Sequence, residues 1–109
     1  MATTYQVIAQ AAPAATTNTD LYTVPASTNI VGSTLVICNR GAADATFRVA
    51  VRPAGAAVAN QHYIFYDSVV YAKATIALTI GLTAAATDKV TVYASTADLS
   101  FSLFGSILT

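Results

Sequence analysis

The clearest alternation of apolar and polar positions lies in residues 33–53, STLVICNRGAADATFRVAVRP. Within residues 47–52 apolar side chains take every second position, and this period of two predicts a β-strand with one face toward water. The preceding residues 35–38 are apolar at every position, which is typical of a strand covered on both faces. Asn39 and Gly41 tolerate positive φ and can reverse the chain between the two runs. The segment therefore predicts a central β-hairpin around which the other strands assemble.

Further short strands are predicted on both sides of this hairpin. They lie at residues 3–10, 20–25, 30–31, 62–71, 75–82, 89–94 and 99–103. Asp67 and Ser68 interrupt the alternation within residues 62–71 and predict a β-bulge there. About eight short strands, with turn signals every 8–12 residues or so and no helical period, indicate an all-β protein built as an antiparallel β-sandwich. The pattern leaves open an Ig-like Greek key and a jelly roll.

The chain divides into two parts by composition. Residues 1–19 are expected to form an N-terminal strand or arm followed by a linker, and residues 20–109 a single β-sandwich domain. Residues 11–19, AAPAATTNT, have no large side chain and cannot bury enough apolar area to offset the entropy of ordering. Two interpretations of the strand at residues 3–10 stay open. It is either an arm that packs on a neighbouring subunit or an edge strand of the same domain.

Charge is scarce in this sequence. Charged residues make up 9% of the chain, against about 25% in an average soluble protein, and the formal net charge is zero. Neutrality argues against nucleic-acid binding and against an electrostatically held membrane partner. The sequence also predicts no secretory leader and no transmembrane helix. A weakly charged domain tends to associate, which favours a surface that is covered by a neighbour.

Candidate catalytic chemistry is limited to a few isolated groups. His62 is the single histidine and could act as a base only toward Asp67 or a hydroxyl. Cys38 is the single cysteine, so it has no intrachain disulfide partner, and its apolar strand predicts a buried thiol. The five acidic residues are scattered aspartates without the spacing of a calcium loop. We therefore expect no enzyme activity, no metal site and no cofactor.

Aromatic and arginine residues provide the candidate interface. A carbohydrate or protein contact surface could be formed by Tyr63, Phe65, Tyr66, Tyr71 and Tyr93, because tyrosine combines apolar area with a polar tip. The same side chains could instead be half-buried packing of the sheet. The outward arginines of residues 47–52 either pair with aspartates of a neighbouring strand or subunit or lie on a solvated face. Two residues of the N-terminal strand complete the candidate set. The full set is Tyr5, Val7, Arg48, Arg52, Tyr63, Phe65, Tyr66, Tyr71 and Tyr93.

Several strand and turn segments resemble a family of small structural proteins of tailed bacteriophages. The likeness spans nearly the whole chain from about residue 8 and includes no catalytic motif. It is found at residues 21–26 (LYTVPA), 35–41 (LVICNRG), 47–53 (FRVAVRP), 62–67 (HYIFYD), 81–83 (GLT) through 91–94 (TVYA), and 101–105 (FSLFG).

The resemblance implies a virion β-sandwich that works as a multimer, made in the host cytoplasm. A capsid cement, or decoration, protein is the first expectation, with a homo-trimer or another homo-oligomer bound to the major capsid protein. The alternative is a tail, baseplate or fibre component among neighbouring tail proteins, with a receptor- or carbohydrate-binding surface. Neither role involves a nucleic acid or a membrane as partner.

Overall fold

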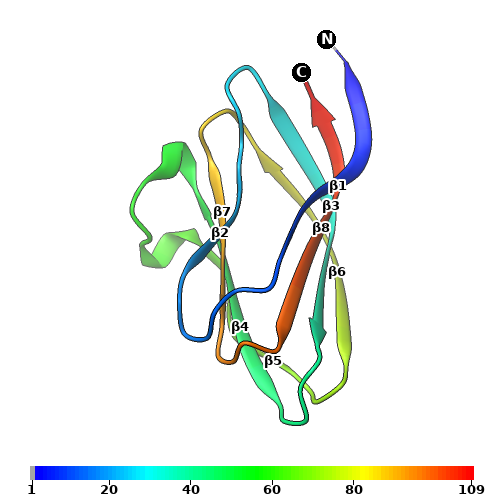
Figure 1. Cartoon of the computed structure of the whole chain (residues 1–109). Coiled ribbons are helices and arrows are strands. Elements are labelled where there is room, and N and C mark those ends of the chain that lie inside the picture. Colours follow the sequence, from blue (N-terminus) through cyan, green and yellow to red (C-terminus); the bar gives the residue numbers. More distant parts are fainter. Residues whose placement is uncertain (1) are drawn as a thin grey trace.

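The computed structural model describes residues 2–109, and over these residues eight β-strands form two antiparallel four-stranded sheets (Figure 1). Two single turns of 3₁₀ helix, Pro53–Gly55 and Asn60–His62, lie in the connection between β4 and β5. The predicted all-β sandwich is confirmed. The strands are β1 (Thr3–Ala11), β2 (Thr19–Thr23), β3 (Asn29–Asn39), β4 (Ala45–Arg52), β5 (Tyr63–Val70), β6 (Thr75–Ala84), β7 (Lys89–Ala94) and β8 (Leu99–Leu108).

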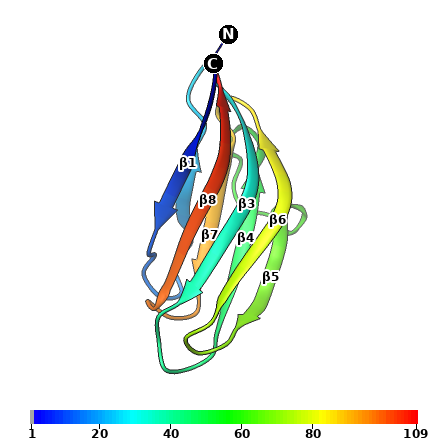
Figure 2. The ribbon, with the colours of Figure 1, turned by 90° about the vertical axis from the view of Figure 1, so that its right-hand side faces the viewer.

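The strand order is that of a jelly roll. The first sheet has the order β1-β8-β3-β6, which Figure 2 shows face on, and the second has the order β2-β7-β4-β5. Because β1 pairs with β8, β2 with β7, β3 with β6 and β4 with β5, the chain is one long antiparallel ribbon. The ribbon is wrapped so that β8 also pairs with β3 and β7 with β4. Of the two arrangements left open by the sequence, the order identifies the jelly roll.

The central hairpin predicted for residues 33–53 is wrong, because β3 and β4 belong to different sheets. The connection between them crosses the sandwich and is held by the buried side chain of Asn39. Its amide nitrogen donates to the carbonyl oxygens of Ala43 and Val70 at 2.9 and 3.1 Å, and its Oδ1 accepts the Gly41 N–H at 2.9 Å. Neither Asn39 nor Gly41 has the positive φ that the sequence suggested. A buried amide, rather than left-handed backbone, directs the chain here.

The core lies between the sheets and follows the predicted alternation. Phe47 and Val49 of β4 are buried, while Arg48 and Arg52 point outward, so the register expected for this strand is confirmed. The alternation expected for residues 75–82 and 99–103 is observed as well, whereas in residues 89–94 Thr91 is buried between Val90 and Val92 and donates to Asp20. The largest fully buried side chains are Phe47, Phe101, Ile30, Leu35, Ile37, Leu99, Leu103, Val24, Val49, Val70, Val90 and Val92.

β1 is an edge strand of this same sandwich and pairs with β8. A register shift at Ile8 points the side chain of this residue toward the core and interrupts the alternation along β1. Val7 opposes the outward Phe104, whereas Ala9 opposes the inward Leu103. Strict alternation along the strand predicted at residues 3–10 would place Ala9 on the same face as Tyr5 and Val7, and the register shift shows that prediction to be wrong.

The outer face of β3 is less covered than its apolar sequence predicted. The strand predicted at residues 30–31 and the run that begins at residue 33 belong to one strand, β3, whose register shifts between Gly32 and Thr34. Val36 and Cys38 are only half-buried, because the described residues place no further layer over this face. The prediction that this strand is covered on both faces, with a buried Cys38 thiol, is therefore wrong.

Glycine is required at position 105, where β8 lies against β3. Gly32 and Gly105 face each other across the two strands. A Cβ atom on Gly105 would collide with the carbonyl oxygen of Val31 and would lie 2.9 Å from the Cα of Gly32. The backbones can come this close because Gly105 lacks a side chain, whereas a Cβ atom on Gly32 would meet the side chain of Leu103 at 2.9 Å.

Candidate interaction site

Arg48 is the centre of an aromatic cluster on the outer face of the second sheet. Its guanidinium carbon lies 4.2 Å from the ring centroid of Tyr66 and 4.3 Å from that of Tyr93. Its Nε donates to Oδ1 of Asp67 at 2.7 Å, and its Nη2 donates to Oδ2 at 3.3 Å. The rings of Tyr63 and Tyr66 meet at 87°, with their centroids 4.9 Å apart. We call these five residues the arginine–tyrosine cluster.

A β-bulge assembles this cluster. On the β7 side Arg48 opposes Tyr93 in regular register. On the β5 side the neighbours of Arg48 pair with Ser68 and Phe65, so Tyr66 and Asp67 together face one residue of β4. Asp67 has φ +52°, a left-handed conformation that costs an L-residue roughly 1–2 kcal/mol. The bulge predicted at Asp67 and Ser68 is thus confirmed, and it brings both the ring and the carboxylate to Arg48.

The ion pair makes the cluster electrically balanced. The hydrogen bond to Asp67 raises the pKa of Arg48 above its ordinary value, and the charge of Asp67 acts in the same direction against partial burial. Of the two interpretations of the outward arginines, pairing with aspartates is the observed one: Arg48 pairs with Asp67 of the neighbouring β5, and Arg52 with Asp20 of β2, which lies beyond β7. The result is a charge-balanced surface of aromatic rings in which each guanidinium face contacts a tyrosine.

A second ion pair lies on the same outer face, across β2, β7 and β4. Oδ1 of Asp20 accepts hydrogen bonds from Arg52 at 2.9 Å and from Thr91 at 3.0 Å, and Lys89 lies 3.5 Å from Oδ2. Burial raises the pKa of Asp20, but the Thr91 hydrogen bond and the charges of Arg52 and Lys89 outweigh it and lower that pKa. This network holds the edge strand β2 to its sheet.

The remaining candidate interface residues are not brought to this cluster. Tyr5 and Val7 lie on the other sheet, and Tyr71 is exposed directly after β5. Phe65 packs against the core, with its ring centroid 5.8 Å from that of Phe47. Asp67 was absent from the candidate set, although the predicted bulge was the signal that could have located it beside Arg48.

His62 and Asp67, the one pair considered for catalysis, are engaged in separate contacts. Nδ1 of His62 accepts the N–H of Ala59 at 3.1 Å, and Asp67 pairs with Arg48. Within residues 2–109, no three histidine, cysteine, aspartate or glutamate side chains gather closely enough to hold a metal ion. Over the same residues, no helix has the length and apolar character needed to cross a bilayer.

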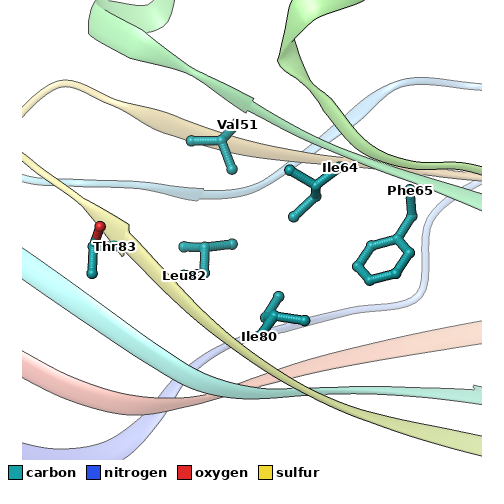
Figure 3. A pocket seen from close by; sticks show the side chains of 6 residues that line it. All are labelled: Val51, Ile64, Phe65, Ile80, Leu82 and Thr83. Carbon is teal, nitrogen blue, oxygen red and sulfur yellow. The ribbon is translucent and has the colours of Figure 1, made fainter.

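An apolar cleft of about 440 Å³ opens between the edge strands of the two sheets. Figure 3 shows its lining side chains, which come from β4 and β5 on one side and from β6 on the other. The cleft offers dispersion contacts and the hydroxyl group of Thr83, and none of its lining residues belongs to the arginine–tyrosine cluster. Its lining residues are Val51, Ile64, Phe65, Ile80, Leu82 and Thr83.

No known family model and no curated protein matches this chain.

Proposed function

We propose that the chain is a non-enzymatic structural protein of a tailed-phage virion, a cement or decoration protein that binds the capsid lattice as an oligomer. The observation that carries this proposal is the arginine–tyrosine cluster on the outer face of a jelly roll. Tyrosine and arginine are the residue types that most often anchor protein interfaces. The likeness of the strand and turn segments to phage structural proteins supports the same role. The jelly roll occurs in viral coat proteins and also in lectins, so it is compatible architecture and no more.

The cluster is suited to docking because its charges are already paired. Arg48 holds Asp67 through two hydrogen bonds before any partner arrives. Covering the cluster therefore does not bury an uncompensated charge, which is the costly case for an interface. The rings of Tyr66 and Tyr93 pack on the guanidinium, so little side-chain freedom is lost on binding. In this proposal the major capsid protein covers the cluster, and no nucleic acid, membrane or cofactor takes part.

The copy number of the chain in purified virions tests the proposal. Quantitative mass spectrometry would give its ratio to the major capsid protein. A cement protein gives a ratio near one or a simple fraction set by the capsid lattice. A few copies to a few dozen per particle would assign the chain to the tail or baseplate instead. Its absence from purified particles would overturn the virion role.

A pair of tyrosine variants tests the docking surface itself. Tyr66→Ala removes one of the two rings that sandwich Arg48, and it should reduce occupancy on capsids that lack the protein. Tyr71→Ala is the matched control, because Tyr71 is similarly exposed but takes no part in the cluster. Equal occupancy of the two variants would exclude the cluster as the capsid contact.

A tail, baseplate or fibre component that binds a receptor glycan is the second candidate. The exposed ring of Tyr66 stands beside the partly exposed carboxylate of Asp67, and sugars bind such pairs by stacking and hydrogen bonding. A glycan array with the purified chain tests it. Binding that is lost in Tyr66→Ala supports this function, and a flat array rejects it.

A further inference from the structure

The four strands of the first sheet contain no charged residue, and Arg40, which follows β3, reaches their outer face at Ser100, to which its Nε donates at 2.8 Å. The five basic and five acidic residues of the chain all lie outside β1, β8, β3 and β6, whose own outward side chains are apolar or are neutral polar groups (serine, threonine, glutamine and Asn29). In Figure 2 this face points toward the viewer. The outer face of the second sheet, by contrast, holds both ion-paired networks. The two faces of the sandwich are thus suited to different partners.

Exposed apolar side chains gather in a patch around Ser106 on this face, six residues along β8 from the Ser100 contact with Arg40. Tyr5 of β1 and Val31 of β3 flank Ser106 of β8 in one row across the sheet. In the next row Val7 lies beside the half-buried Phe104. Tyr5 is 82% exposed, Val7 44% and Val31 39%, although each is large and apolar. Contiguous exposed apolar side chains of this kind mark a surface that binds another protein.

The chemistry of the patch favours a second copy of this chain as its partner. Two identical copies that meet across a two-fold axis bring the same surface together, so a charged face places like charges against each other. The patch of Tyr5, Val7, Val31 and Phe104 contains no charged side chain and avoids this repulsion. A charged partner would bury its charges without counter-ions on this patch, whereas the same patch of a second copy brings only apolar and neutral polar groups. Because it is neutral, the patch can therefore pack against the identical patch of a second copy.

We propose that two copies of the chain associate face to face through the outer surface of β1, β8 and β3, with the patch around Val31 at the contact. This goes beyond the virion role, because it concerns the purified chain and holds whether or not the chain is found on capsids. It also leaves the arginine–tyrosine cluster of each copy free, on the opposite side of the dimer.

Sedimentation velocity on the purified chain, from about 1 to 100 µM, tests the inference. Val31→Lys places a positive charge on the patch in both copies, and we expect the dimer dissociation constant to rise roughly tenfold or more. Val69→Lys is the matched control, because Val69 is 47% exposed on β5 of the other sheet, and it should dimerise like the wild type. Circular dichroism establishes that both variants are folded.

Tyr5→Ser provides an independent variant if Val31→Lys does not fold. Tyr5 lies on an edge strand and is largely exposed, so its truncation should leave the fold intact while weakening the dimer. A wild type that stays monomeric throughout the range overturns the inference. An odd-numbered oligomer, or dimerisation that neither variant weakens relative to Val69→Lys, overturns it as well. None of these results bears on the virion copy number, so the two proposals fail separately.

Discussion

Truncation of Phe101 is the most direct test of the core, and we expect Phe101→Ala to lower the free energy of unfolding by about 3–5 kcal/mol. Phe101 is 0% exposed, and its ring meets that of Phe47 at 71°, with centroids 6.2 Å apart. Burying a phenylalanine side chain contributes roughly 1.5–3 kcal/mol of transfer free energy. The cavity left between the two sheets adds the remainder, since hydrogen-bonded strands on both sides relax only partly.

Urea unfolding followed by circular dichroism measures this loss, and the slope of the transition should stay unchanged. At roughly 4 °C per kcal/mol, the same loss lowers Tm by about 12–20 °C. Phe104→Ala is the control: Phe104 is on the same strand but faces outward, so in the monomer it should cost about 1 kcal/mol. Equal losses for the two variants, or a loss below about 1.5 kcal/mol for Phe101→Ala, would refute the placement of Phe101 between the sheets.

Three further predictions address the arginine–tyrosine cluster, the contact between β8 and β3 at Gly105, and the carboxylates of Asp20 and Asp88. A double-mutant cycle of Arg48→Ala and Asp67→Ala should give a coupling of roughly 0.5–1 kcal/mol that shrinks in high salt, because the side chains are 24% and 45% exposed; zero coupling at low salt would contradict the pairing. Gly105→Ala should destabilise the fold by about 1–3 kcal/mol in thermal unfolding, because the added Cβ would collide with the backbone of β3 at Val31. An unchanged Tm would argue against this close contact between β8 and β3. Backbone N–H groups lower the pKa of Asp88; burial raises the pKa of Asp20, but the Thr91 hydrogen bond and two cations outweigh it and lower that pKa. Both carboxylates therefore stabilise the fold when they are ionised, and the free energy of unfolding should decrease as the pH falls below their ordinary pKa of 3.8. Urea titrations at several pH values should show a smaller decrease for Asp88→Asn.

The positions of the strands could be predicted because alternation is a local property. Residues 47–52 and 99–103 alternate over consecutive residues, and the side that faces the core follows without knowledge of any partner. The bulge at Asp67 was predictable for the same reason, because two polar residues interrupt an otherwise apolar run. All-β class and sandwich architecture therefore followed from the sequence.

Strand partners could not be predicted, because both sheets have the same inward pattern. A turn that reverses within one sheet and a turn that crosses to the other contain the same residue types. At Asn39 the difference lies in hydrogen bonds to Ala43 and to Val70, which is 31 positions away in the chain. The arginine–tyrosine cluster had the same difficulty, since Arg48 meets Asp67 and Tyr93 only after β5 and β7 have paired with β4.

The pairing of β8 with both β1 and β3 has a consequence for synthesis of the protein. β1 leaves the ribosome early, yet its partner arrives late: Gln10 and Ser102, joined by a side-chain hydrogen bond, are 92 positions apart. Until then β1 has no partner in its sheet, and β3 has one edge of unpaired backbone N–H and C=O groups. Pairing over such separations is slow. Two chains that are synthesised close together on the same mRNA therefore have time for the β8 of one to pair with β1 and β3 of the other. Exchange of β8 between copies is therefore the misassembly to which this topology is most exposed.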